Sequence, residues 1–206
     1  MIIEKLTLGT YGANCYIVAD EKEKQCIIID PGSEAEKIIK LIDSKGYTPI
    51  HIVLTHGHVD HICAATTLKN EYGISIMVHR ADEYLLKSKE LNLSSKTSYG
   101  DMEFTPDVLL EDGKKIKFGS LHAKVIHTPG HTKGGICLLI ENSLFSGDTL
   151  FMYSYGRYDL EGGNFDKIRK SITNRLFKLN PKTLVYPGHG GSTTIGAEIK
   201  SNPIND

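Results

Sequence analysis

Apolar residues along the chain fall into short runs that end at glycine, proline or aspartate. The run at residues 26–29 is apolar at every position and ends at residues 30–32, Asp-Pro-Gly. A strand with one buried face alternates apolar and polar residues, so this run predicts a strand covered on both faces. The same reasoning predicts strands over residues 2–8, 14–19, 25–30, 50–55, 74–79, 116–118, 123–126, 135–140 and 143–145. A hairpin turn at Glu141-Asn142 is expected between the last two.

Between several of these runs, apolar residues recur at intervals of three and four, the spacing of one helix face. Ser33, with Glu36 three residues on, has the pattern of an N-cap, and Gly46 has the pattern of a helix end. These signals predict a helix over residues 34–45. Further helices are predicted at 60–72, 81–88 and 165–179. Residues 89–106 lack periodicity, so we expect a loop or lid there.

Length and composition suit one compact domain over residues 1–206, with 40% hydrophobic and 24% charged residues. The net charge of -1 and the scattered lysines and arginines give no reason to expect a nucleic-acid partner. Charges interrupt the first apolar stretch, and no 18-residue apolar segment occurs. We therefore expect no membrane partner and a cytoplasmic location.

The cysteines show no CxxC spacing, so we expect reduced thiols rather than disulfides. They are Cys15, Cys26, Cys63 and Cys137. Cys63 follows the histidine-rich segment by two residues. It is interpreted either as a packing residue or as a neighbour of that segment's ligands.

The strongest chemical signal is the HxHxDH pattern of residues 56–61, directly after the apolar run 52–54. Imidazoles and carboxylates are preferred ligands of zinc-like ions. Side chains two apart in an extended segment point the same way, which favours His56 and His58 on one ion. Asp60 and His61 are consecutive, project differently and favour a neighbouring ion.

Three more candidate ligands each follow an apolar run: His131 after Pro-Gly, Asp148 after Ser-Gly and His189 after Pro-Gly. Strand ends of this kind are expected to meet at one crevice. The repeated Pro-Gly-His at 129–131 and 187–189 also hints at two related halves. The remaining histidines have no motif role and are expected to be ordinary polar residues: His51, His79, His122 and His127.

The combined motifs THxHxDH, PGHT, GDTLF and YPGHG resemble the metallo-β-lactamase fold, and within it the short glyoxalase II-like, or hydroxyacylglutathione hydrolase-like, members. The resemblance runs from residues 14–16 through 30–32 to 202–203 and implies a four-layer αββα sandwich, an α/β architecture. It implies two divalent ions, with zinc favoured and iron or manganese as alternatives. It assigns His56, His58 and His131 to the first ion, Asp60, His61 and His189 to the second, and Asp148 to both.

Two such ions can share a hydroxide that is nucleophilic near neutral pH. The resemblance therefore implies a hydrolase that cleaves a small-molecule thioester such as S-lactoylglutathione, with Asp60 both ligating and orienting the nucleophile. No GxSxG motif supports a serine nucleophile, and no P-loop or dinucleotide fingerprint is present. By the same resemblance, Asp30 either supports a ligand or caps its turn.

Other functions stay open. A persulfide dioxygenase of the same family would hold one iron with His56, His131 and Asp148. Another ester or a lactone is a third possible substrate class. A structural zinc ion, or a metal-stapled binding module, is the non-catalytic alternative, although structural sites are usually rich in cysteine.

Substrate residues carry weaker signals. The chain ends without the helical domain that contacts glutathione in larger glyoxalase II enzymes, and residues 62–64 differ from the usual small residues, so the thiol half stays open. Residues 152–159 gather three tyrosines beside Arg157. Arg157 or Tyr155 is a candidate contact for a substrate carboxylate, with an Arg157-Asp159 pair that shapes the loop as the alternative.

Overall fold

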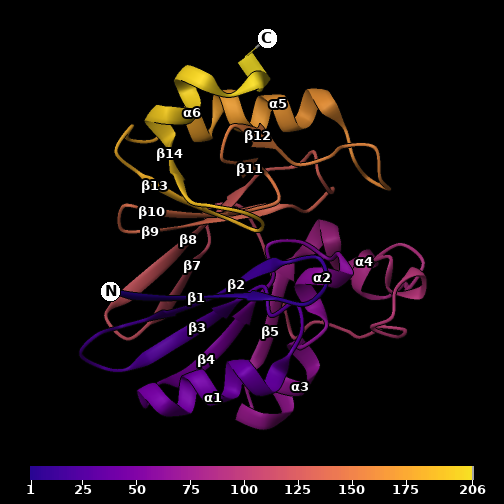
Figure 1. Ribbon diagram of the computed structural model, residues 1–206, viewed down its shortest axis with the longest axis vertical. Helices are drawn as coiled ribbons and strands as arrows, with labels where there is room; N and C mark the ends of the chain where they lie inside the picture. Colours follow the sequence, from indigo (N-terminus) through magenta and orange to yellow (C-terminus); the bar gives the residue numbers. More distant parts are fainter. Residues whose placement is uncertain (206) are drawn as a thin grey trace.

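Two six-stranded sheets face each other in the computed structural model, which describes residues 1–205 (Figure 1). The first sheet has the strand order β1-β2-β3-β4-β5-β6 and the second the order β14-β13-β10-β9-β8-β7. The first sheet comprises β1 Ile2–Leu8, β2 Ala13–Ala19, β3 Gln25–Ile29, β4 Thr48–Val53, β5 Ser75–His79 and β6 Val108–Leu110. The second comprises β7 Lys115–Phe118, β8 Leu121–His127, β9 Ile136–Ile140, β10 Ser143–Gly147, β13 Leu184–Pro187 and β14 Thr193–Thr194. A small hairpin pairs β11 Leu150–Phe151 with β12 Ser154–Tyr155.

Helices cover the outer face of each sheet, which completes the αββα layering (Figure 1). The α-helices are α1 Ala35–Lys45, α2 Val59–Ile62, α3 Ala65–Tyr72, α4 Glu83–Leu86, α5 Phe165–Asn174 and α6 Ile195–Ser201. Short 3₁₀ segments lie at η1 Arg80–Asp82, η2 Ser94–Lys96, η3 Leu176–Lys178 and η4 Pro203–Asn205. Among the described residues, no helix is long and apolar enough to cross a bilayer.

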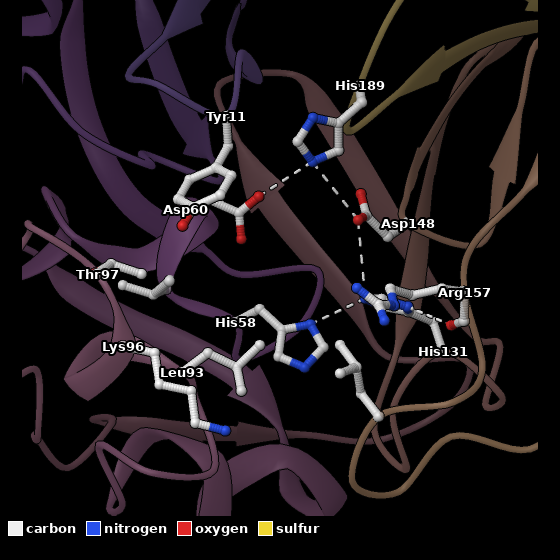
Figure 2. Close-up of a pocket in the computed structure, with 12 residues that line it drawn as sticks. Tyr11, His58, Asp60, Leu93, Lys96, Thr97, His131, Asp148, Arg157 and His189 are labelled. Carbon is white, nitrogen blue, oxygen red and sulfur yellow. Dashed lines mark hydrogen bonds and ion pairs between the residues drawn. The ribbon is translucent and has the colours of Figure 1, made fainter.

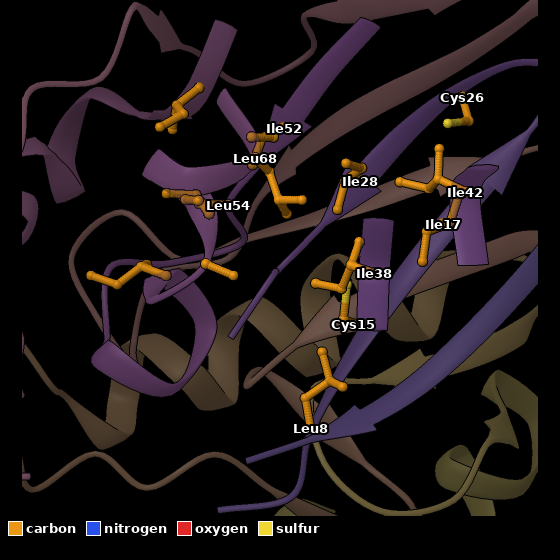
Figure 3. Packing of buried hydrophobic residues seen from close by; sticks show 14 of the residues in the cluster. Leu8, Cys15, Ile17, Cys26, Ile28, Ile38, Ile42, Ile52, Leu54 and Leu68 are labelled. Atoms are coloured by element: carbon orange, nitrogen blue, oxygen red, sulfur yellow. The ribbon is translucent and has the colours of Figure 1, made fainter. Parts of the chain in front are cut away.

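The core explains why the strands read as continuous apolar runs. In β2, Cys15 and Ile17 pack toward α1 and α3 on the outer face, whereas Tyr16 and Val18 pack between the two sheets. Figure 3 shows the outer cluster, where Ile38 of α1 lies among the strand residues. Both faces of these strands are therefore buried, and neither face needs polar residues.

The structure confirms the predicted αββα layers, the buried β3 and the two-residue turn between β9 and β10, where Ile140 pairs with Ser143. It corrects the predicted N-cap of α1. The cap position is Glu34, in a left-handed conformation with φ 52°, and its carboxylate accepts a hydrogen bond from the Gly9 amide. The Ser33 hydroxyl is buried and makes no hydrogen bond among the described residues.

Predicted helices at 60–72, 81–88 and 165–179 are each interrupted or shortened. The first is split into α2 and α3 because the Ala64 amide donates to the carbonyl of Pro31 instead of continuing the helix. The second begins as the 3₁₀ turn η1, and the third ends at Asn174 before η3. The short elements β6, β11, β12, β14 and α6 were not predicted.

Candidate metal centre

The seven candidate ligands lie together at one edge of the two sheets. The segment after β4 brings His56 and His58, and α2 brings Asp60 and His61. Loops of the second sheet bring His131 after β8, Asp148 after β10 and His189 after β13. Figure 2 shows side chains from both sheets turned toward one another. The expectation that distant strand ends meet at one crevice is met by the geometry.

One set of ligands, here called the imidazole group, consists of His56, His58 and His131. The Nδ1 atom of His58 and the Nε2 atom of His131 are 2.9 Å apart. The other ring nitrogen of His131, Nδ1, donates to the Arg157 carbonyl oxygen at 2.7 Å. This hydrogen bond fixes the ring and leaves Nε2 free for the centre.

A second set, here called the mixed group, consists of Asp60, His61 and His189. The Nε2 atom of His189 lies 3.2 Å from Asp60 Oδ2. The Nε2 atoms of His61 and His189 are 3.3 Å apart. The candidate ligand atoms of the three residues all lie within 4.8 Å of one another, so the group could hold a metal ion.

Asp148 lies between the two groups. Its Oδ1 atom is 3.4 Å from His61 Nε2, and its Oδ2 atom is 3.8 Å from His131 Nε2. The side chain thus reaches both groups at once. Gly188 makes this approach possible, because a Cβ atom there would lie 2.2 Å from Asp148 Oδ1.

Asp30 supports the mixed group from behind. Its carboxylate accepts hydrogen bonds from the Thr55 amide and hydroxyl, and its Oδ2 atom lies 3.0 Å from His61 Nδ1. A carboxylate on Nδ1 orients the ring and leaves Nε2 for a metal. Of the two interpretations of Asp30, the contacts favour support of His61 over capping of its own turn.

Two rings of the imidazole group, His56 and His58, are uncharged. Burial and then the neighbouring His61 lower the pKa of His56 far below its usual value. Burial and His131 lower the pKa of His58 to about 3. Both rings are therefore neutral at pH 7, which is the form that binds a metal.

The mixed group behaves in the opposite way. Burial alone would lower the pKa of His61, but Asp60, Asp148 and Asp30 raise it to about 10. Burial alone would also lower the pKa of His189, but Asp60 and Asp148 outweigh this effect and raise it. Partial burial alone would raise the pKa of Asp60, but His61 and His189 hold it below the usual range, so this carboxylate is ionised.

Unsatisfied atoms indicate that the residues fit a metal. Among the described residues, the buried Nε2 atoms of His56 and His58 and the buried Oδ1 atom of Asp148 have no hydrogen-bond partner. Buried polar atoms without partners cost free energy, and bonds to a cation would satisfy those that face the centre. The donor set of imidazoles and carboxylates suits zinc, iron or manganese.

A cavity of about 450 Å³ opens over the centre. Besides ligands, its lining includes Tyr11, Leu93, Lys96, Arg157 and Leu160. The segment 93–97 was expected only to be a loop or lid, and none of its residues was singled out. Their one sequence signal is that they lie in the longest stretch without periodicity, where binding residues concentrate.

The candidate substrate residues differ in placement. Arg157 lines the cavity, but its guanidinium makes two 2.8 Å hydrogen bonds to Asp159. Tyr155 is not among the lining residues and packs near Phe165, with ring centroids 6.2 Å apart. The loop-shaping interpretation of the Arg157-Asp159 pair therefore describes the geometry.

The remaining histidines and Cys63 lie apart from the centre. His79 and His127 stack on each other with ring centroids 4.0 Å apart, and His51 Nδ1 lies 3.0 Å from the Ser75 hydroxyl. The Cys63 thiol donates to the Val59 carbonyl, and burial raises its pKa to about 12. A thiol held in this state is a packing group. All four cysteines are free.

Comparison with known proteins decides the family. A family model described as the metallo-β-lactamase superfamily matches residues 8–189. The chain belongs to this superfamily. Among curated relatives, an uncharacterized protein of Aquifex aeolicus is 41% identical, with 99% of this chain and 97% of the relative covered. The hydroxyacylglutathione hydrolase GloC of Haemophilus influenzae is 34% identical, with 99% and 98% covered.

Solved structures of this superfamily share the fold closely. The B3 metallo-β-lactamase BLEG-1 matches with a TM-score of 0.93 and 35% identity, covering 98% of both chains. TTHA1623 in a di-iron-bound form matches with a TM-score of 0.86 and 35% identity, covering 97% of this chain and 98% of that one. ETHE1 from Myxococcus xanthus matches with 0.81 and 29%, covering 98% and 84%. The fold is thus that of the metallo-β-lactamases.

Proposed function

We propose that this member of the metallo-β-lactamase superfamily is a dinuclear metallohydrolase that cleaves a small thioester. The observation that carries the proposal is the position of Asp148 between the two groups. Its Oδ2 atom lies 3.8 Å from His131 of the imidazole group and 3.6 Å from His189 of the mixed group, and its Oδ1 atom lies 3.4 Å from His61. A carboxylate that reaches both groups can bridge the two ions of a dinuclear site. The similarity to a di-iron-bound structure and to a hydroxyacylglutathione hydrolase supports the same proposal.

In this proposal, His56, His58 and His131 hold one ion, Asp60, His61 and His189 hold the other, and Asp148 bridges them. Such ions, when bound, polarise a carbonyl and lower the pKa of water. Zinc is favoured by the imidazole-rich donors, and iron and manganese are compatible with the carboxylates.

The chain's own residues contribute orientation and proton handling. Asp60 is ionised and partly open to the cavity, so it accepts a hydrogen bond from the attacking water and aligns it. A thiolate is a good leaving group and needs no general acid at the sulfur. A thioester therefore depends less on a proton donor in the cavity than an alkyl ester does.

The part of the cavity wall that includes Lys96 favours a substrate with an anionic tail. Lys96 lines the cavity and makes no ion pair among residues 1–205. Leu93 and Leu160 add apolar surface beside it. This combination fits an acyl thioester whose thiol half carries a carboxylate, glutathione included.

Persulfide dioxygenation is the second candidate, favoured by the similarity to ETHE1. It would use one iron on His56, His131 and Asp148, whereas the mixed group would have no catalytic task. Hydrolysis of another ester or a lactone is a third.

Metal content and oxygen dependence test the proposal. Freshly purified protein is analysed for metals and assayed with S-lactoylglutathione in anaerobic buffer. We expect two metals per chain and cleavage of the thioester in the absence of oxygen. One iron per chain, with oxygen uptake on glutathione persulfide and no thioester cleavage, would instead establish the dioxygenase.

A further inference from the structure

Asp82 is a buried carboxylate that the chemistry above does not use. It ends η1, the 3₁₀ turn that follows the strand β5 of the first sheet, and its exposed fraction is 0%. A carboxylate is costly to bury unless hydrogen bonds satisfy its oxygens. The hydrogen-bond donors to Asp82 therefore show which segments this side chain holds in place.

Three donors from two separate loops converge on this side chain. The Gly57 amide donates to Oδ2 at 3.3 Å, and the Thr132 hydroxyl donates to the same oxygen at 2.7 Å. The Gly134 amide donates to Oδ1. Gly57 belongs to the loop after β4, and Thr132 and Gly134 belong to the loop between β8 and β9.

Both loops carry the imidazole group. Gly57 is flanked by His56 and His58, and Thr132 directly follows His131. Asp82 thus connects the backbone between the first two imidazoles, from one sheet, to the residue beside the third imidazole, from the other. It touches none of the three rings, so any effect on them passes through the loops.

The second loop also approaches Asp82 closely through its backbone. A Cβ atom at Gly134 would lie 2.5 Å from the Asp82 amide nitrogen and 2.8 Å from the Ala81 carbonyl carbon. Only glycine permits this contact. The loop that carries His131 therefore packs directly against the turn that carries Asp82, and the Asp82 carboxylate adds hydrogen bonds to this contact.

We propose that Asp82 is a positioning residue that sets the spacing of His56, His58 and His131 and thereby determines metal affinity at the imidazole group. The inference rests on the proposed metal centre. Residues that orient metal ligands through hydrogen bonds typically contribute about 10- to 100-fold to metal affinity or activity. Asp82 orients the ligands through their main chains.

The test measures zinc binding directly. Chelator-treated Asp82→Asn protein is titrated with Zn²⁺ against a chromophoric competitor, and the Co²⁺-loaded protein is examined for its ligand-field spectrum. The amide keeps the size of the side chain but replaces one acceptor by a donor, which faces existing donors. Zinc binding at the imidazole group, which we expect to be the tighter of two binding steps, should weaken about 10- to 100-fold. The Co²⁺ spectrum should change as well.

Asp20→Asn is the matched control. Asp20 is also buried and also joins the two sheets, since its carboxylate accepts hydrogen bonds from the Ser120 amide and hydroxyl between β7 and β8. It contacts no ligand-bearing loop. Asp20→Asn is expected to lower the melting temperature and to leave zinc affinity and the Co²⁺ spectrum unchanged.

Thr132→Val keeps the test decisive if Asp82→Asn does not fold. It removes one donor to Asp82 with almost no change in shape, and a smaller loss of zinc affinity, about threefold to tenfold, is expected. Unchanged zinc affinity in the folded Asp82 or Thr132 variants, relative to Asp20→Asn, overturns the inference. A wild-type protein that binds no zinc, iron or manganese overturns the proposed metal centre itself, and the positioning role with it.

Discussion

The imidazole group and the mixed group share one crevice but differ in charge and exposure. His56, His58 and His131 are at most 4% exposed, and no carboxylate belongs to their group. In the mixed group, the side chains of Asp60 and His189 are 19% and 28% exposed. Burial keeps His56 and His58 neutral, whereas three carboxylates around His61 keep that ring protonated.

This difference means that the two groups bind a cation at different cost. His56 and His58 are already in the metal-binding form at pH 7, so binding displaces no proton from either ring. The mixed group must release a proton from His61, whose pKa is raised to about 10, before that ring can ligate. The first ion is therefore expected to bind more tightly than the second at neutral pH.

Replacing Asp148, the carboxylate shared by the two groups, should abolish metal binding at both of them. Asp148→Ala takes one ligand from each group, so we expect loss of both metals and a fall in kcat of at least about a thousandfold. Elemental analysis and S-lactoylglutathione turnover check this. Normal metal content and turnover in this variant would falsify the bridging role of Asp148.

Replacing one ligand of the mixed group should separate the two groups. His189→Ala is expected to keep about one metal per chain at the imidazole group while turnover falls about a hundredfold. His58→Ala is the matched comparison, and it should instead weaken the tighter step of a zinc titration. Equal effects of the two variants on both binding steps would mean that the groups do not act as separate sites. Unaltered turnover in His189→Ala would mean that the mixed group has no catalytic task.

The proton states predict a pH dependence that differs between the groups. The raised pKa values of His61 and His189 mean that these rings hold protons at low pH, and a metal must displace them. Affinity of the mixed group should therefore increase with pH, by roughly tenfold per pH unit for each proton displaced. His58, with a pKa of about 3, stays neutral from pH 6 to pH 8, so the tighter step should change little. Zinc titrations at both pH values measure the two slopes, and parallel slopes would contradict this assignment.

Variants of residues in the cavity wall test on which side of the cavity the tail of the substrate lies. In Figure 2, Lys96 and Leu93 are drawn next to His58, whereas Tyr11 is drawn next to Asp60. Lys96→Ala is expected to raise KM for S-lactoylglutathione about fivefold with kcat nearly unchanged, because one charge-assisted contact is lost. KM for a neutral lactoyl thioester of N-acetylcysteamine should not change. Lys87→Ala, which alters a lysine paired with Glu83 outside the cavity, serves as the control.

The smallest effect is expected at Arg157. Its guanidinium is held by Asp159, and both side chains are mostly exposed, with 60% and 63% of their surface accessible. Such exposed pairs contribute little. Arg157→Ala should change kcat/KM for S-lactoylglutathione by less than about threefold. A larger rise in KM, confined to anionic thioesters, would reassign the anionic subsite from Lys96 to Arg157.

Strand prediction succeeded where burial on two faces leaves an unmistakable pattern. The run at 26–29 became β3, and the turn at Glu141-Asn142 became a two-residue hairpin. Helix boundaries failed where a tertiary hydrogen bond replaced a local one. The Pro31 carbonyl takes the Ala64 amide and breaks the predicted helix at 60–72, and nothing in the local sequence signals that competition.

The candidate ligands were visible in the sequence because metal chemistry needs particular side chains at particular spacings. Asp82 was not visible. The sequence predicted only a helix over residues 81–88 and did not single out Asp82, yet its carboxylate is fully buried and accepts hydrogen bonds from two loops. The lining residue Lys96 lies in a segment whose sequence shows only a lack of periodicity.

The sequence by itself determined which side chains are available for metal chemistry and which segments are buried on both faces, because each depends on residue type and local spacing. Only the tertiary structure decided which imidazoles are neutral and which are protonated. The pKa values of His58 and His61 move in opposite directions although only two residues separate them, because burial and carboxylates brought from distant segments set the balance.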